Sequence, residues 1–124
     1  MFSYSFNQND HWARVTAVGE IDLQHTARFS KALDNLEASG AAVVEIDLQH
    51  VTYINSEGVG RMIILRKRIA QSGGVVRLLR PNPTVLLVLQ QCGLEQFLNV
   101  SNEAHEKDDG WLTNDTVHPI LCPT

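Results

Sequence analysis

Ser56 is the side chain of this 124-residue chain best placed for reversible chemistry. It stands immediately before a predicted helix, in the segment N-S-E-G-V-G at residues 55–60. A phosphate on a serine at the start of a helix faces the positive end of the helix dipole and the free N–H groups of the first turn. Such a phosphate changes a binding surface by its charge and bulk. One interpretation is therefore that Ser56 is a phosphoacceptor.

A purely structural role for Ser56 is also open. Serine is a favoured N-cap, whose hydroxyl accepts a hydrogen bond from the first turn of the helix. Gly58 and Gly60 each lower the stability of that turn by roughly 0.5–1 kcal/mol, and close approach by another part of the backbone is one reason for such a cost. The two roles of Ser56 are compatible, because a capping serine already lies at the helix mouth.

The first half of the chain alternates between strand and helix patterns. Alternating apolar residues predict strands at residues 2–6 and 12–18, joined as an antiparallel hairpin. Apolar residues with helical spacing then predict a helix that begins at Thr26 as its N-cap and ends before Gly40. Residues 41–48 are short, β-branched and apolar on both faces, which is typical of a central strand covered by helices.

The second half continues the same alternation. We predict a helix at 57–71, a buried strand at 75–79, a helix from Pro83 to Cys92 capped by Asn82, and an edge strand at 97–100. The order β-β-α-β-α-β-α-β predicts an α/β domain with a mixed β-sheet of about five strands. Loops 19–22 and 52–60 each follow a strand, and ligands and partners collect at such loops in these folds.

The helix at 57–71 has two faces. Placing its residues at 100° steps predicts an apolar face made of Gly58, Val59, Met62, Ile63, Leu65, Ile69 and Ala70. On the opposite, charged face, Ile64 lies between Arg61 and Arg68. A single surface isoleucine is ordinary. Alternatively, Ile64 anchors a partner interface whose basic rim suits an acidic partner.

The charge of the chain is unevenly distributed. Ten bases and fourteen acids give a net charge of −4, which argues against nucleic acid or an anionic membrane as the main partner. Residues 1–100 are neutral, and five acids against Lys107 place the whole excess in the last 24 residues. We predict a folded domain at 1–101 and an acidic tail at 102–124. The tail either forms a short helix docked through Trp111 or is a flexible appendage.

Other site classes lack their usual signatures. The apolar runs are far shorter than the roughly 20 residues of a membrane span, and no secretory signal is visible, so we expect a cytoplasmic protein. Cys92 and Cys122 form no C-x-x-C pair, and the histidines lack metal-ligand spacing, so we expect free thiols and neither metal nor cofactor. Walker A, G-x-S-x-G and paired-carboxylate motifs are missing too, so we expect a non-enzymatic protein. We also expect a monomer.

Over roughly residues 2–100, the chain resembles the STAS domain of bacterial anti-sigma factor antagonists. G-E-I-D at 19–22 is similar to the family's G-E-[LI]-D, and N-S-E-G-V-G at 55–60 is similar to its D-S-[ST]-G-[LVI]-G. L-Q-H-V-T-Y-I at 48–54 also matches its usual L-x-x-V-x-[FY]-[IM]. The resemblance implies the STAS fold and a binding module in a partner-switching pathway. A constitutive STAS scaffold without phosphorylation is the alternative.

The resemblance also implies partners and roles. The unphosphorylated domain would bind a GHKL-type serine kinase that doubles as an anti-sigma factor, and phosphorylation of Ser56 by that kinase would break the complex. A PP2C-type serine phosphatase would restore binding. Asp22 would be the acidic residue beside the phosphorylation site. The predicted surroundings of the phosphosite are Asp22, Asn55, Glu57, Gly58 and Gly60, and the predicted partner-binding residues are Glu20, Arg61, Ile64 and Arg68.

Two positions depart from the family pattern. Asn55 replaces the motif's aspartate, and Glu57 replaces its second serine or threonine. Asn55 keeps a turn-compatible hydrogen-bonding side chain but removes a carboxylate. Glu57 restores one carboxylate two residues later, where it favours the helix N-terminus and can pair with Arg61. The local charge is therefore similar, while its geometry differs.

Overall fold

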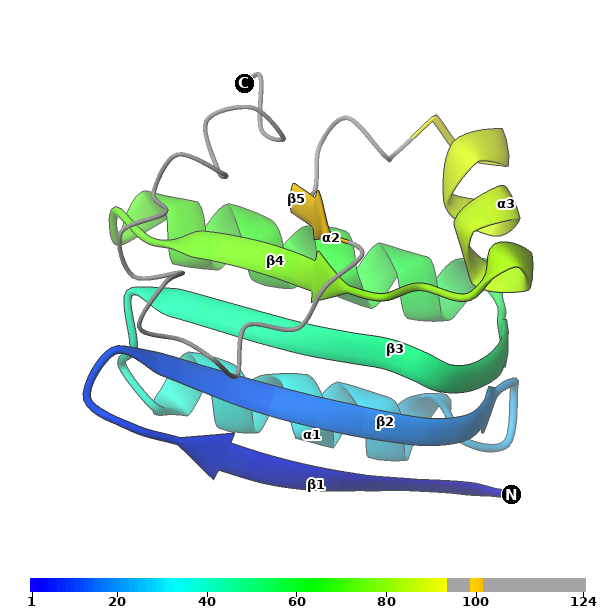
Figure 1. The fold of residues 1–124 in the computed structure, drawn as a ribbon, viewed down its shortest axis with the longest axis horizontal. Helices are drawn as coiled ribbons and strands as arrows, with labels where there is room; N and C mark the ends of the chain where they lie inside the picture. Colours follow the sequence, from blue (N-terminus) through cyan, green and yellow to red (C-terminus); the bar gives the residue numbers. More distant parts are fainter. Residues whose placement is uncertain (94–98, 102–124) are drawn as a thin grey trace.

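In the computed structural model of the protein, a five-stranded β-sheet forms the centre (Figure 1). The structure describes residues 1–93 and 99–101. The strand order is β1-β2-β3-β4-β5. The elements of the described residues are β1 (Phe2–Gln8), β2 (Trp12–Ile21), α1 (Thr26–Ala38), β3 (Val43–Ile54), α2 (Ser56–Gln71), β4 (Val75–Leu79), α3 (Pro83–Gln91) and β5 (Asn99–Ser101).

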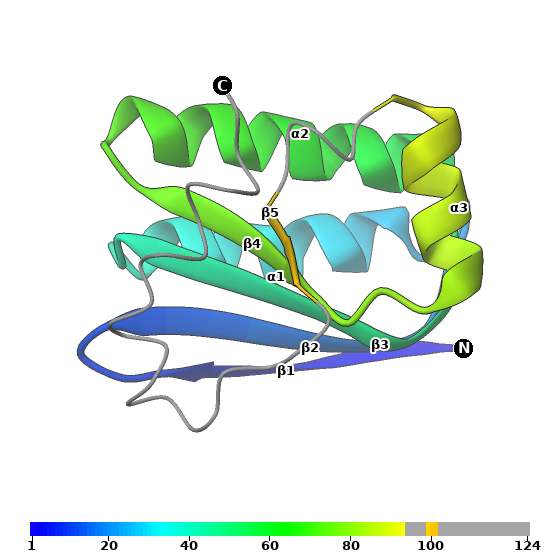
Figure 2. The same cartoon turned by 45° about the horizontal axis from the view of Figure 1, so that its top comes forward.

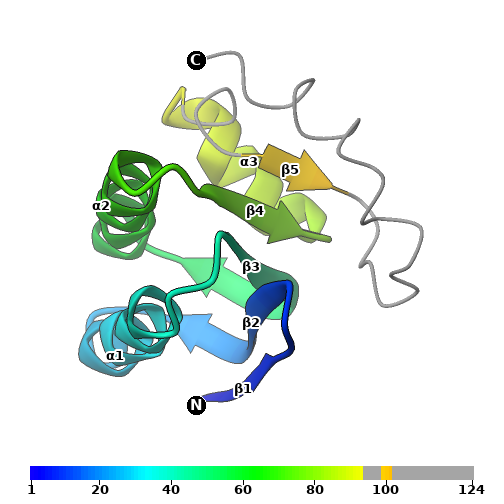
Figure 3. The same cartoon turned by 90° about the vertical axis from the view of Figure 1, so that its left-hand side faces the viewer.

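The sheet is mixed. Strands β1 and β2 are antiparallel, whereas β2, β3, β4 and β5 run parallel to one another, which confirms the predicted hairpin and the predicted mixed sheet. Helices α1 and α2 lie side by side on one face of the sheet, and α3 lies near the carboxyl end of β4 (Figures 2 and 3). This arrangement follows from the crossover connections, because each returning helix must pack back onto the parallel strands it joins.

The apolar core fills the space between the sheet and the helices α1 and α2. Alternate residues of β2, β3 and β4 point toward these helices and are fully or almost fully buried. Phe29 of α1 meets Phe2 of β1 edge-on, with ring centroids 6.1 Å apart. A period of two along the strands and of 3.6 along the helices places these residues on facing surfaces.

Charged residues occupy the opposite face of the sheet, and this differs from the prediction that residues 41–48 are apolar on both faces. Glu45 is completely buried and contacts Arg14 of β2, with Arg14 Nε 2.9 Å from Glu45 Oε1. Asp47 is paired with Arg80 at 2.5 Å. Burial raises the pKa of Glu45 and outweighs the opposing attraction of Arg14, and burial also lowers the pKa of Arg77. Pairing across strands makes these buried charges tolerable.

Several helix and strand ends differ from the prediction. Thr26 is not the N-cap of α1, because His25 holds that position and the Thr26 hydroxyl donates to the Asp22 carbonyl oxygen. The predicted cap Asn82, the following Pro83 and the left-handed Gly40 after α1 are confirmed. In the part of the chain that the structure describes, no helix combines the length and the apolar character required to cross a membrane. The predicted tail at 102–124, with Trp111, lies outside the described residues.

Candidate functional site

Two loops meet at the carboxyl ends of β2 and β3. The sequence placed residues 52–54 in a loop, but β3 continues to Ile54 because it stays paired with the end of β2 as far as Ile21. The backbone N–H of Asn55 then donates to the carbonyl oxygen of Ile21 at 3.0 Å. Asp22 follows Ile21, and Ser56 follows Asn55. The parallel pairing of β2 and β3 therefore brings Asp22 and Ser56 to the same edge of the sheet.

Asn55, not Ser56, caps helix α2. The side-chain oxygen of Asn55 accepts a hydrogen bond from the N–H of Gly58 at 2.8 Å, and its carbonyl oxygen accepts from Val59. The alternative interpretation, in which Ser56 is the N-cap, is therefore wrong, because the neighbouring asparagine already occupies that position. Ser56 is the first helical residue, it is exposed, and its hydroxyl makes no hydrogen bond within the described residues.

The two glycines of the first turn differ in their surroundings. A Cβ atom at Gly58 would lie 2.8 Å from Ile21 Cγ2 and 3.0 Å from Ile54 Cγ1, so only glycine fits between these buried side chains and the helix. The predicted close approach is thus present at Gly58, although side chains rather than backbone make it. At Gly60, a Cβ atom would meet nothing within 4 Å, so the prediction of a close approach is wrong there.

Three acidic side chains belong to the two segments that meet at this edge of the sheet. Asp22 is 36% exposed, and its Oδ1 accepts a hydrogen bond from the N–H of Gln24 at 3.1 Å. Glu57 pairs with Arg61 one turn later at 3.6 Å, as predicted. Glu20 is exposed and lies 3.5 Å from the amino group of Met1. The site thus combines a serine hydroxyl without a structural task and nearby carboxylates.

His25 is a residue of this site that the sequence reasoning did not select. Its Nδ1 lies 2.8 Å from Asp22 Oδ1, and its side chain is only 18% exposed. The spacing D-x-x-H was the only signal in the sequence, and it is weak. The proximity depends on the tight turn between β2 and α1, in which the His25 N–H donates to the Asp22 carbonyl oxygen.

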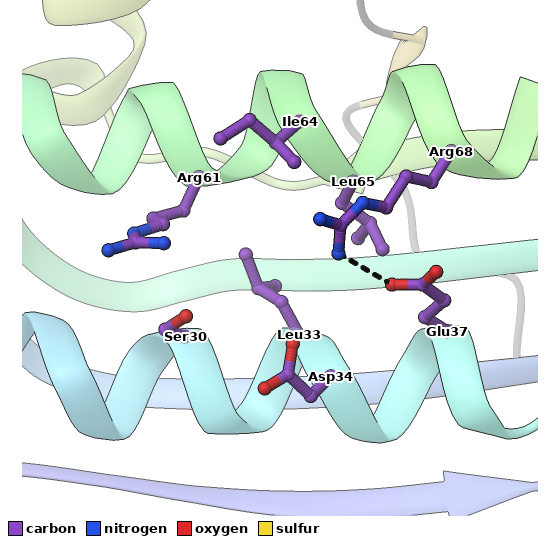
Figure 4. A pocket seen from close by; sticks show the side chains of 8 residues that line it. All are labelled: Ser30, Leu33, Asp34, Glu37, Arg61, Ile64, Leu65 and Arg68. Carbon is purple, nitrogen blue, oxygen red and sulfur yellow. Dashed lines mark hydrogen bonds and ion pairs between the residues drawn. The ribbon is translucent and has the colours of Figure 1, made fainter.

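The charged face of α2 borders a groove of about 70 Å³ between α1 and α2 (Figure 4). The structure brings Arg61, Ile64 and Arg68 together on one wall of this groove. Ile64 is 43% exposed. Arg68 Nη1 lies 3.3 Å from Glu37 Oε1 of α1, so an acidic residue partly balances the predicted basic rim.

Other predicted positions lie elsewhere. Glu20 does not line the α1–α2 groove but lies at the end of β2, opposite Tyr53 in the sheet. Ala70 is exposed, contrary to its predicted place on the apolar face, whereas its neighbour Ile69 is buried as predicted. The described residues hold no cluster of three or more His, Cys, Asp or Glu suited to a metal ion.

The fold and the site define an α/β domain that presents an unused serine hydroxyl where two strand-end loops meet. Residues 4–107 match the family model of the STAS domain. The chain therefore belongs to the STAS domain family, and the predicted family and fold are confirmed.

Solved structures of anti-sigma factor antagonists share this fold. One from Mycobacterium paratuberculosis is 18% identical, with a TM-score of 0.77, and the match covers 92% of this chain and 93% of that one. The antagonist SpoIIAA in its unphosphorylated form is 20% identical, with a TM-score of 0.67 and coverages of 91% and 97%. The Bacillus cell fate determinant SpoIIAA in its phosphorylated form is 20% identical, with a TM-score of 0.60 and coverages of 87% and 98%. A comparison with curated protein sequences gives no match.

Proposed function

We propose that this chain is an anti-sigma factor antagonist-like binding module in a partner-switching pathway, controlled by reversible phosphorylation of Ser56. The observation that carries the proposal is the state of Ser56 itself. Its side chain is exposed at the first position of α2, while Asn55 performs the capping. A hydroxyl that contributes nothing to the helix can be modified without loss of the fold. This also removes the main support for a constitutive scaffold in which Ser56 serves only as a cap.

A phosphate on Ser56 would change the charge of the site strongly. It adds about −1.5 to −2 charges at neutral pH, close to the N-terminus of α2, whose dipole favours an anion. Asp22 and Glu57 already carry negative charge nearby. The phosphorylated site would thus remain folded but repel an acidic partner surface that the unmodified site accepts. We infer that this repulsion releases the partner when Ser56 is phosphorylated.

The partners that we propose follow from the motifs at residues 19–22 and 55–60. They are a GHKL-type serine kinase that acts as an anti-sigma factor, and a PP2C-type serine phosphatase that removes the phosphate. The similar SpoIIAA structures, one unphosphorylated and one phosphorylated, support a fold that accommodates both states. In this proposal the chain acts in the cytoplasm as a binding module and catalyses no reaction itself.

The proposed contact surface extends from Ser56 along α2. Ile64 is the apolar anchor, because it is a large exposed side chain in the middle of a charged face. Arg61 and Arg68 flank it, and Glu20 contributes from the end of β2. An exposed isoleucine in a shallow groove loses water on binding, and the charged rim determines which partner fits.

Intact-protein mass measurement on protein from native cells tests the switch. We expect one phosphate on the wild type and on Ser72→Ala, which changes an exposed serine at the other end of α2, and none on Ser56→Ala. Absence of phosphate from the wild type under every growth condition would refute the proposal.

Binding and folding are then measured separately. Ser56→Asp and Ile64→Asp should each weaken capture of the kinase by about tenfold or more, which corresponds to 1.4 kcal/mol. Both positions are exposed, so the free energy of unfolding should change by no more than about 0.5 kcal/mol. A large loss of stability in Ser56→Asp would instead indicate a structural role for the serine.

A further inference from the structure

His25 connects the N-terminal strand to Asp22, which ends the loop that meets the start of α2. Its ring stacks on Phe2 of β1, with centroids 6.2 Å apart and an angle of 30° between the planes. On its other side, Nδ1 lies 2.8 Å from Asp22 Oδ1. Nδ1 is buried, and its close contact with the Asp22 carboxylate lacks the alignment of a hydrogen bond. The imidazole is therefore held between an aromatic ring and a carboxylate.

The contact with His25 determines which carboxylate oxygen of Asp22 remains available to a partner. Oδ1 contacts His25 and accepts a hydrogen bond from the N–H of Gln24. Oδ2 makes no hydrogen bond within the described residues, and the Asp22 side chain is 36% exposed. The carboxylate is thus held by one oxygen while the other stays open to a partner. Without His25, only one backbone N–H would restrain its rotation.

We propose that His25 is a positioning residue: it holds the Asp22 carboxylate so that Oδ2 faces the kinase that phosphorylates Ser56. This inference rests on the proposed function and adds a residue to the same site. A kinase that reaches the Ser56 hydroxyl must cover the adjoining loop, because the Asn55–Ile21 hydrogen bond ties the two loops together. A carboxylate that is already ordered does not have to be ordered during binding.

The expected change in KM follows from the cost of ordering the Asp22 side chain during binding. Immobilising one side chain at an interface weakens binding by an amount that corresponds to about a 2- to 10-fold change in affinity. We therefore expect loss of the His25–Asp22 contact to raise the apparent KM of the kinase for this protein about 2- to 10-fold. The maximal rate should stay the same, because Ser56 itself is untouched.

Two substitutions separate this role from ring packing. His25→Phe keeps an aromatic ring against Phe2 and removes the polar contact to Asp22. His25→Asn removes the ring but keeps an N–H donor near the position of Nδ1. If His25 positions Asp22, His25→Asn retains the wild-type KM and His25→Phe does not. If the histidine serves only to pack against Phe2, the order of the two variants is reversed.

The assay uses the purified full-length variants as substrates. A clarified extract of native cells that lack the endogenous protein serves as the kinase source, with radiolabelled ATP, and initial rates are followed over a range of substrate concentrations. Thermal unfolding by circular dichroism shows that each variant is folded under the assay conditions. Should His25→Phe fail to fold, His25→Leu removes the same contact. A double variant with Asp22→Ala should be no worse than Asp22→Ala alone, since both changes act through one carboxylate.

The outcomes distinguish the two proposals. A raised KM for His25→Phe with a wild-type KM for His25→Asn supports the inference. Equal KM values for His25→Phe and the wild type, or an equal rise in both variants, overturn it and leave the proposed function intact. If the wild type is not phosphorylated at Ser56 while a Ser56-independent control substrate is, the proposed function fails and the inference fails with it.

Discussion

Replacement of Gly58 by alanine tests the packing that holds the start of α2 against the sheet. An added Cβ atom would lie 2.8 Å from Ile21 Cγ2 and 3.0 Å from Ile54 Cγ1. Both isoleucines are at most 1% exposed, and these atoms belong to short, branched parts of the side chains that cannot move aside. The helix start or one of the two strand ends must therefore shift.

The expected magnitude combines two opposing terms. Overpacking a filled core costs about 1–3 kcal/mol. Glycine to alanine in a helix contributes about 0.5–1 kcal/mol in the opposite direction. Gly58→Ala should therefore lower the free energy of unfolding by roughly 1 kcal/mol, which is the difference between typical values of these terms.

Gly60→Ala is the matched control, because it lies two residues further along the same helix. Its Cβ atom meets nothing within 4 Å, so the variant should gain about 0.5–1 kcal/mol. The helix-propensity term is common to both variants and largely cancels. The difference between them, about 1–3 kcal/mol, then measures the steric cost alone.

Urea unfolding followed by circular dichroism gives the free energies of unfolding, and thermal unfolding checks them. One kcal/mol corresponds to about 4 °C in Tm for a chain of this size. Equal stabilisation of Gly58→Ala and Gly60→Ala would show that the end of β2 does not press on α2 as described. The arrangement of Asp22 and Ser56 rests separately on the hydrogen bond from the Asn55 N–H to the Ile21 carbonyl oxygen.

Two further predictions concern the cap and the buried glutamate. Asn55→Ala should lower the free energy of unfolding by about 1 kcal/mol, whereas Ser56→Ala should lower it by less than about 0.5 kcal/mol. If urea unfolding ranks the two variants the other way, Ser56 rather than Asn55 is the N-cap. Burial raises the pKa of Glu45 above its ordinary value of 4.5, so the folded state binds this proton more tightly than the unfolded state does. The stability of the wild type relative to Glu45→Gln should therefore be greatest below pH 4.5 and should fall as the pH rises through the folded-state pKa of Glu45. Urea unfolding at a series of pH values measures this difference in stability. A difference that stays constant or increases with pH would contradict the raised pKa of Glu45.

The fold was predictable to a large extent because its signals are local. Strand β4 and the Asn82 cap of α3 depend on apolar runs and on turn residues next to them in the chain. The antiparallel hairpin likewise follows from two alternating runs joined by a short turn. Hydrogen bonds and side-chain periodicity within a segment decide such features, so a single segment contains the information.

Features that depend on register between distant strands were less predictable. The sequence placed residues 52–54 in a loop, but pairing with the end of β2 keeps them in β3. Glu45 interrupts a β-branched run, and only its position opposite Arg14 explains why a carboxylate is buried there. Each of these outcomes depends on a partner more than 30 residues away along the chain.

The sequence by itself determined the family, the order of the elements and the serine at the helix mouth, because these are written in short motifs and local periodicity. Only the tertiary structure decided that Asn55 takes the cap and that the Ser56 hydroxyl is left without a structural task. It also placed His25 against Asp22, in the turn that enters α1. The physical reason is that capping and side-chain contacts depend on backbone direction at the strand ends, which the parallel pairing of β2 and β3 sets.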